Sequence, residues 1–134
     1  MLFSILIFTT ALFSGIALAA PTTPQDASVS AEIRFYDPSV GPGACGQTHQ
    51  ASEHIVALGY ELFDAQAPGG NPNNNPLCGK KIRVSYGSKS VDVTITDRCP
   101  DANCKGNNLD LSQGAFEVLS PTTPGVISGT WEYI

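Results

Sequence analysis

The feature that most constrains the fold of this chain is a stretch in its second half where apolar and polar residues alternate. The apolar positions are Ile82, Val84 and Tyr86, followed by Val91, Val93 and Ile95. Gly87-Ser88 lies between the two runs and suits a tight turn. Because successive side chains of a strand point to opposite faces, the pattern predicts a β-hairpin with one buried face.

Two further segments alternate in the same way and predict strands near the two ends of the domain. Glu32 to Tyr36 forms a weakly alternating first strand. Residues 126–134 form a final strand, with Ile127, Trp131 and Tyr133 on one face. The apolar run from His54 to Leu58 is too short for its pattern to distinguish a strand from a helix.

The segment from Leu111 to Leu119 has apolar residues at helical spacing and predicts a short helix. Asp110 and Gln113 stand where the two partners of an N-terminal capping box would be. Glycine, proline and asparagine mark three loops, at residues 37–46, 65–77 and 97–108. About six short strands with one or two short helices predict a mainly β fold of the small-barrel kind.

The N-terminal segment has the composition of a secretory signal peptide. Residues 2–20 contain no charged side chain, and the apolar run ends in Ala17-Leu18-Ala19, small residues where a signal peptidase reads. We expect a signal peptide over residues 1–19, a disordered leader over residues 20–30 and a secreted, extracellular domain over residues 31–134. The alternative is a membrane anchor, but serine, threonine and glycine dilute the apolar run.

Four cysteines follow the predicted signal peptide, and an even number in such a protein indicates two disulfides. Three connectivities are possible. Cys99 and Cys104 lie close enough for a local clip, which would leave Cys45 to pair with Cys78. The rival interpretation is a zinc site. It is disfavoured because the cysteines are not in paired CxxC spacing and the chain has only two histidines.

The formal charge of the chain is −5, and its few lysines and arginines are scattered. This argues against nucleic acid and against anionic membrane surfaces as partners. Neither a phosphate-binding glycine loop nor a nucleophile elbow is evident, so we expect no cofactor and no metal. We also expect a monomer.

Three aspartates lie at the ends of predicted elements, where carboxylates can meet at one rim of a barrel. Asp37 follows the first strand, Asp97 ends the hairpin, and Asp110 precedes the helix. A pair of carboxylates beside a polar groove performs glycoside chemistry, one as acid and the other as base or nucleophile. In the alternative interpretation all three are structural, Asp110 as a helix cap and the others as turn residues.

Several motifs occur in a characteristic order along residues 31–134. They are Phe35-Tyr36-Asp37, Gly43-Ala44-Cys45-Gly46, Ile55-Val56-Ala57-Leu58, Thr96-Asp97-Arg98-Cys99-Pro100, Leu109 to Phe116, and Gly125-Val126-Ile127 to Trp131. Together they resemble single-domain expansin-related proteins, and fungal loosenins most of all. The family is the double-psi β-barrel group that includes the bacterial rare lipoprotein A domain, the first domain of expansins, barwin and kiwellin.

The resemblance implies a six-stranded double-psi β-barrel with an open polysaccharide groove. In expansins the aspartate matching Asp110 is required for wall loosening, and the one matching Asp97 lines the same groove. In related barrel endoglucanases the position of Asp110 is the general acid, and a motif like Arg34 to Asp37 supplies the base. Tyr36 and Trp131 would stack on sugar rings, although a tryptophan on a terminal strand is also a normal core residue.

The sequence departs from expansins in ways that bear on function. Expansins usually have threonine at the position of Arg34 and a groove tyrosine at the position of Cys99. The second, carbohydrate-binding expansin domain has no counterpart, so weak binding to crystalline cellulose is expected.

Three functions remain open at this point. The leading hypothesis is non-hydrolytic loosening of cell-wall polysaccharide, such as cellulose or chitin, centred on Asp110 with Asp97 assisting and Asp37 as a third polar wall. The second is inhibition of a foreign protease or binding of a host protein, as in papain-inhibitor and kiwellin relatives, through the loops at residues 38–46 and 68–76. The third is an inverting glycosidase that uses Asp110 and Asp37.

Overall fold

The computed structural model describes residues 15–16 and 27–134. Apart from residues 15–16, the predicted signal peptide lies outside the described residues, as do residues 20–26 of the predicted leader. The end of the leader prediction is wrong, because Val29 and Ser30 already belong to the first strand. No helix within the described ranges is long and apolar enough to cross a membrane.

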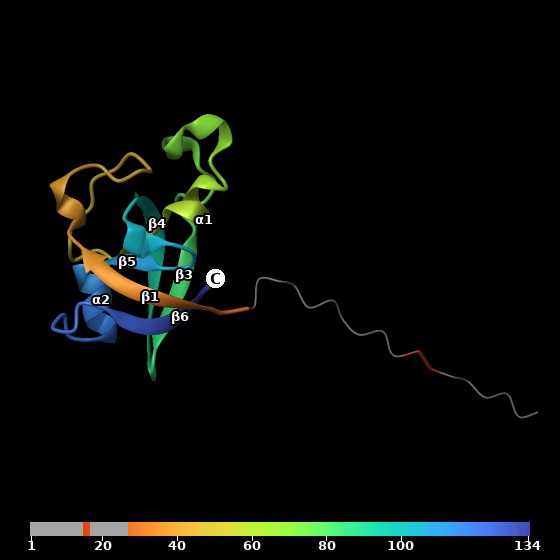
Figure 1. The fold of residues 1–134 in the computed structure, drawn as a ribbon, viewed down its shortest axis with the longest axis vertical. Helices are drawn as coiled ribbons and strands as arrows, with labels where there is room; N and C mark the ends of the chain where they lie inside the picture. The colour runs from red at the N-terminus through yellow and green to blue at the C-terminus, as the bar shows by residue number, and fades with distance from the viewer. Residues whose placement is uncertain (1–14, 17–26) are drawn as a thin grey trace, which may run out of the picture.

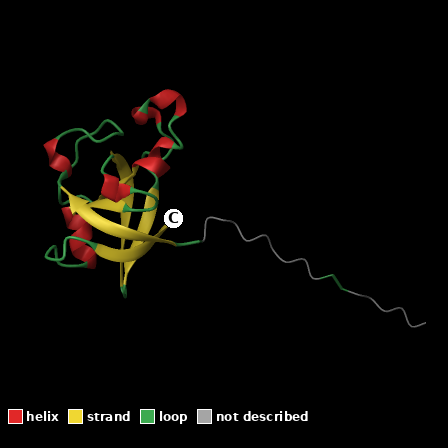
Figure 2. Ribbon diagram, in the orientation of Figure 1, coloured by secondary structure: helices red, strands yellow, loops and turns green. Residues whose placement is uncertain are grey.

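Six strands close into a barrel in the order β1-β5-β2-β4-β3-β6, which confirms the predicted mainly β fold (Figures 1 and 2). The strands are β1 (Val29–Tyr36), β2 (Ile55–Gly59), β3 (Lys81–Tyr86), β4 (Lys89–Cys99), β5 (Leu109–Ser112) and β6 (Ile127–Tyr133). Two short helices, α1 (Tyr60–Asp64) and α2 (Gln113–Leu119), pack on the barrel. Four 3₁₀ turns lie in the loops, at Pro38–Val40, Pro68–Gly70, Pro72–Asn74 and Ala102–Cys104.

The pairing of the strands shows why the barrel closes. The predicted hairpin is β3 and β4, which pair antiparallel through Val84 and Val91 with Gly87 at φ 58° in the turn. Two pairs are parallel, β1 with β5 and β2 with β4. Because parallel neighbours need crossover connections, strands that are distant in sequence lie side by side and bring their ends together.

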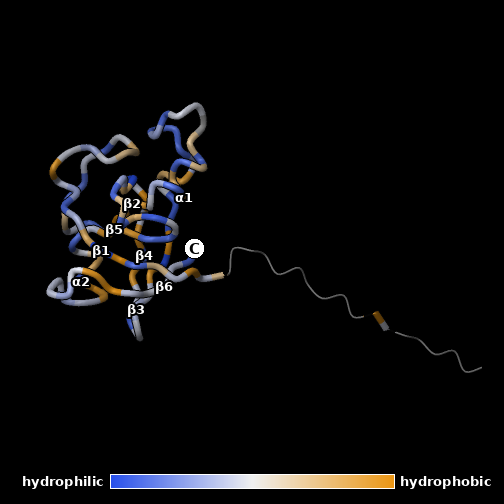
Figure 3. Tube along the Cα trace, in the orientation of Figure 1, coloured by the Kyte–Doolittle hydropathy of each residue, from blue (hydrophilic) through white to orange (hydrophobic). Residues whose placement is uncertain are grey.

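Alternating apolar residues from all six strands fill the barrel, and Figure 3 shows the apolar segments gathered there. Ile33, Val84, Leu109 and Leu111 are fully buried inside. Phe116 of α2 is also fully buried and packs against Phe35 with ring centroids 4.9 Å apart. The polar residues that alternate with these apolar ones along the strands therefore face outward, where a functional site can form.

Two sequence predictions near the site are wrong. Residues 97–99 are not loop but the end of β4, and residues 109–112 form β5, so Asp110 is a strand residue and not a helix cap. Helix α2 begins at Gln113 without a side-chain cap. The alternation of Leu109, Asp110 and Leu111 is typical of a strand, but the strand has only four residues. The helical spacing of the apolar residues that follow it obscures this alternation in the sequence. The undecided run at residues 54–58 is a strand, β2.

The two disulfides are Cys45–Cys78 and Cys99–Cys104, the connectivity that the local spacing of Cys99 and Cys104 favoured. The first joins two long loops, and Figure 1 shows both rising from the same end of the barrel. The second closes a short loop beside β2 and β5. In the chain-entropy description the long bridge stabilises the fold by about 4 kcal/mol and the short one by about 2 kcal/mol.

Candidate functional site

A row of outward-facing residues crosses four neighbouring strands of the barrel. Asp97 of β4 is in register with Ala57 of β2, Ala57 with Asp110 of β5, and Asp110 with Arg34 of β1. Residues in register point to the same face of a sheet. We call Asp97, Ala57, Asp110 and Arg34 the cross-strand row, and it brings together two of the three predicted aspartates.

Asp110 is the half-buried centre of the cross-strand row. Its Oδ1 atom is buried without a hydrogen-bond partner among the described residues, and its Oδ2 lies 3.8 Å from the sulfur of Cys99, which is in a disulfide and has no proton to donate. Burial raises the pKa of Asp110 to about 6, against the lowering effect of Arg34 and with smaller raising effects of Asp101 and Asp97. This carboxyl therefore holds a proton at mildly acid pH.

Asp97 is held in place by three donors. Its Oδ1 accepts the backbone N–H groups of Ala44 at 2.7 Å and Arg98 at 2.8 Å. Its Oδ2 accepts the hydroxyl of Tyr36 at 3.2 Å. Burial, and then the charge of Asp97, raise the pKa of Tyr36 far above its usual value, so this phenol stays protonated and donates. Asp97 thus fixes the loop at residues 38–46 to the barrel while its side chain remains part of the cross-strand row.

A small apolar cluster forms the floor between the two aspartates. Ala57 is buried under the Cys99–Cys104 disulfide, and Tyr36 packs against the same cluster. The loop that carries Cys104 passes very close to Gly59 at the end of β2, where an added Cβ would clash with the carbonyl oxygen of Cys104. The Cys99 sulfur of this cluster lies beside Asp110, whose burial raises its pKa.

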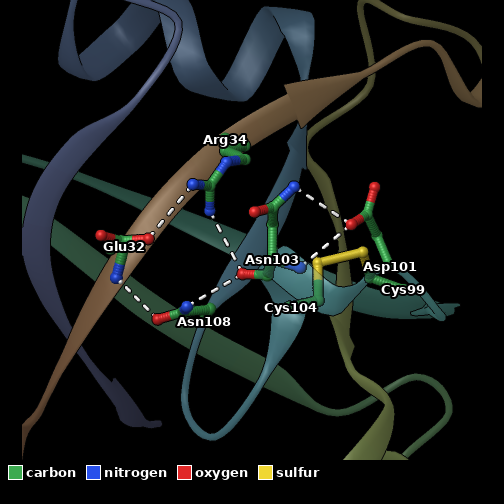
Figure 4. A network of polar contacts seen from close by, with 7 residues as sticks. All are labelled: Glu32, Arg34, Cys99, Asp101, Asn103, Cys104 and Asn108. Carbon is green, nitrogen blue, oxygen red and sulfur yellow. Dashed lines mark hydrogen bonds and ion pairs between the residues drawn. A yellow bond between two sulfur atoms is a disulfide. The ribbon is translucent and has the colours of Figure 1, made fainter.

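Arg34, the last residue of the row, belongs to a polar network that Figure 4 shows. Arg34 donates to the carbonyl oxygen of Asn103 at 3.2 Å and to Glu32 at 3.2 Å. The side chain of Asn108 donates to the same carbonyl at 2.9 Å and accepts from the backbone N–H of Glu32. Asp101 caps the 3₁₀ turn by accepting from Asn103. The loop after Cys99 is therefore fixed against β1.

Asp37 lies apart from this arrangement. It is fully exposed just after β1, and its Oδ1 accepts from the backbone N–H and the hydroxyl of Ser39. These two hydrogen bonds lower its pKa. Asp37 thus organises a local turn, as the structural interpretation expected.

Trp131 also lies outside the row. It is 3% exposed inside the barrel, and its indole N–H donates to the carbonyl oxygen of Asn107 at 2.8 Å. Tyr133 packs edge-on against it. The ring faces of Trp131 are covered by the core, so it offers no platform for a sugar. Of the two predicted stacking residues, only Tyr36 reaches the row.

A depression of about 710 Å³ lies on the outer surface of β1, β6 and β3. Glu32 and Asn108, which belong to the network around Arg34, form part of its wall. Sequence reasoning did not find this depression, nor the role of Arg34 as the neighbour of Asp110. Only strand register reveals them, and register depends on which strands pair.

The sulfurs of Cys99 and Cys104 and the carboxylate of Asp110 do not make a metal site. Cys99, Cys104 and Asp110 lie close enough together to hold an ion. However, both sulfurs are joined in a disulfide, which leaves no thiolate to coordinate a metal.

The fold and site define a double-psi β-barrel protein with an outer carboxylate row. The sequence model of the family described as "Lytic transglycolase" matches residues 31–131. This match covers most of the chain, which therefore belongs to that family of double-psi β-barrel domains.

Two curated relatives represent different branches. A papain inhibitor of Streptomyces mobaraensis is 35% identical over 127 residues, covering 90% of this chain and 85% of that protein. Expansin-like protein 1 of Dictyostelium discoideum is 30% identical over 140 residues, covering 98% of this chain and 46% of that protein. The chain is thus homologous to both kinds of protein and spans less than half of the second.

Solved structures agree with this assignment. The Streptomyces papain inhibitor has a TM-score of 0.71 and 34% identity, covering 84% of this chain and 99% of that one. An expansin variant of Clavibacter michiganensis, solved in complex with cellohexaose, has a TM-score of 0.65 and covers 81% of this chain and 50% of that one. Its identity is 21%, so that likeness is one of fold.

Proposed function

We propose that this protein binds a cell-wall polysaccharide along the cross-strand row and loosens it without cleaving it. The observation that carries the proposal is Asp110, a half-buried carboxyl with a raised pKa on the outer face of the barrel, next to Arg34 and across β2 from Asp97. A protonated carboxyl can donate a hydrogen bond to a glycan oxygen, and such a bond competes with those between polysaccharide chains.

The same geometry gives less support to hydrolysis by inversion. That reaction needs a second carboxylate about 6.5–9.5 Å away that activates water on the opposite face of the sugar. Asp37 is occupied by Ser39, and Asp97 is occupied by three donors. Neither is placed as a free base. We therefore propose that Asp110 acts alone as a donor, with Asp97 and Arg34 shaping its surroundings.

The test is mechanical weakening of cellulose paper and of chitin film by the wild type and by Asp110→Asn. We expect the wild type to weaken at least one material without releasing reducing sugar. Asp110→Asn should keep the same fold by circular dichroism and lose at least tenfold in weakening. Full weakening by a folded Asp110→Asn protein would contradict the proposal. Release of reducing ends in proportion to the weakening would show that the protein hydrolyses the polysaccharide instead of loosening it without cleavage.

Protease inhibition is a second candidate, favoured by the loop at residues 38–46. Val40 at its apex is 86% exposed, while both ends of the loop are fixed, by Asp37 at one end and by the hydrogen bond from Ala44 to Asp97 and the Cys45–Cys78 disulfide at the other. A rigid loop with an exposed apolar residue loses little entropy when it enters a protease cleft. The papain inhibitor relative, similar over nearly its full length, adds weight.

Papain itself separates the two candidates. If the protein is an inhibitor, it slows papain, Val40→Asp weakens inhibition at least tenfold, and Asp110→Asn inhibits as well as the wild type. No slowing of papain by a molar excess of the wild type would exclude this candidate for proteases of that type. If Asp110→Asn loses polysaccharide loosening and Val40→Asp keeps it, the polysaccharide-binding function is favoured.

A further inference from the structure

Four of the nine residues that line the depression on β1, β6 and β3 carry a hydroxyl side chain. They come from three adjacent strands: Ser30, Ser128, Thr130 and Ser85. Ser30 and Ser85 are both in register with Thr130, so three hydroxyls form one line, and Ser128 stands beside Glu32 in the next. Within the described part of the chain, no residue hydrogen-bonds to these four hydroxyls.

The chemistry of the lining limits what it can hold. Its charged side chain is a carboxylate, Glu32, and among its described residues there is no cation and no aromatic ring. An anionic ligand would meet repulsion there, and a nucleobase or planar apolar ligand would find nothing on which to stack. Free hydroxyls with a carboxylate instead match a neutral ligand rich in hydroxyl groups. The volume of about 710 Å³ lies in the range of ligand sites.

The depression is continuous with the cross-strand row. Glu32 forms its wall and pairs with Arg34, and Arg34 is the register partner of Asp110. From Asp110 on β5 the surface passes one strand spacing of about 5 Å to Arg34 on β1, and then two residues, about 7 Å, along β1 to Glu32, whose register partner on β6 is Ser128. A polymer that lies on Asp110 and turns along β1 at Arg34 would enter the depression at Glu32 and Ser128.

We propose that the depression is a second glycan-binding subsite, which holds further sugar units of the neutral polysaccharide that lies on Asp110. This inference rests on the proposed function and adds a direction and a specificity to it. The polysaccharide would run from Asp97 over Asp110 to Arg34, and then along β1 past Glu32 and Ser128 toward Ser30 and Thr130. Hydroxyl contacts in the subsite would take the place of aromatic stacking, for which the depression has no ring. Neutral glycans would be preferred over those rich in uronic acid.

The test measures the affinity of cellotriose, cellohexaose and hexagalacturonate by calorimetry. For the wild type we expect cellohexaose to bind about tenfold more tightly than cellotriose, and hexagalacturonate more weakly than cellohexaose. Combining Thr130→Val with Ser128→Ala removes two hydroxyls at nearly constant shape. This variant should lose about five- to tenfold for cellohexaose and little for cellotriose. Thr123→Val, an exposed threonine outside the depression, is the matched control.

Equal affinity for the two neutral lengths, or an unchanged affinity of the double variant for cellohexaose, would overturn the subsite. Stronger binding of hexagalacturonate than cellohexaose would overturn it as well. These outcomes leave the proposed function intact, because that function is tested by loosening with Asp110→Asn. Failure of the wild type to bind any of the three probes, or chitohexaose, would overturn both.

Discussion

Asp97 and Asp110 face the same side of the barrel with a single strand between them, because Ala57 of β2 is the register partner of both. Their environments nevertheless differ. Asp97 accepts three hydrogen bonds, whereas Asp110 has a buried oxygen without a partner and a pKa raised to about 6. Two like residues on one face are thus separated into a structural anchor and a proton carrier.

The pKa of Asp110 predicts a pH dependence of stability. Because the folded protein holds this proton more tightly than the unfolded chain, the contribution of Asp110 is favourable below about pH 4 and is lost as the pH rises to about 6. Asp110→Asn cannot lose a proton. Relative to the wild type it should therefore gain stability between pH 4 and pH 7, by up to about 3 kcal/mol. Urea unfolding of both proteins at several pH values measures this gain, and a constant difference would contradict it.

Asp97 is predicted to matter for stability as well as for the site. Asp97→Ala leaves the N–H of Ala44 and the hydroxyl of Tyr36 without their acceptor, which should cost about 2–3 kcal/mol. Hydrogen exchange at Ala44 should quicken by at least tenfold. The control is Asp92→Ala, which removes an exposed ion pair with Arg83 and should cost less than about 1 kcal/mol. Equal losses for the two variants would show that Asp97 is not an anchor.

The close cover over β2 is tested by adding one methyl group. Gly59→Ala places a Cβ against the carbonyl oxygen of Cys104, so the loop must move, and the free energy of unfolding should fall by about 3 kcal/mol. Gly41→Ala is the matched control, since its Cβ would meet no atom within 4 Å and its backbone is extended. It should change stability by less than about 0.5 kcal/mol. Thermal unfolding of both variants decides, and a tolerated Gly59→Ala would mean that the cover is loose.

The Cys99–Cys104 disulfide is predicted to tune Asp110. Replacing both cysteines by serine removes the sulfur beside Asp110 and loosens the loop, so water reaches the carboxyl. We expect the pKa of Asp110 to fall toward its usual value, with a loss of about 2 kcal/mol in stability. NMR titration of the Asp110 carboxyl reports the shift directly. An unchanged pKa in a folded variant would mean that other groups bury Asp110.

Local pattern was sufficient for much of the fold. The alternation at residues 82–95 predicted the β3–β4 hairpin, and the short spacing of Cys99 and Cys104 predicted the local disulfide. The resemblance supplied the barrel topology, which local pattern does not encode. β5 was missed because only four residues separate the preceding loop from α2, too few for a period to be distinguished. The composition of the loop at residues 65–77 predicts a surface segment. It does not predict that Asn75 is buried and donates a hydrogen bond to the carbonyl oxygen of Phe63.

The site was predicted in part, for a physical reason. Asp97 and Asp110 were identified, but the sequence does not state that they share Ala57 as a register partner, which follows from β2 lying between β4 and β5. Arg34 was noted as a departure from the expansin pattern and as the first residue of an endoglucanase-like motif, but not as a neighbour of Asp110. Its position beside Asp110 depends on the parallel pairing of β1 with β5, a contact between residues far apart in the chain.

The measurement that tests the account most directly is the pH profile of polysaccharide loosening by the wild type, set against the NMR titration of Asp110 in the same buffer. If a protonated Asp110 performs the loosening, both curves have the same midpoint, near pH 6, and activity is high below it and lost above it. Loosening that stays constant from pH 4.5 to about pH 7.5 while Asp110 titrates within that range would contradict the account.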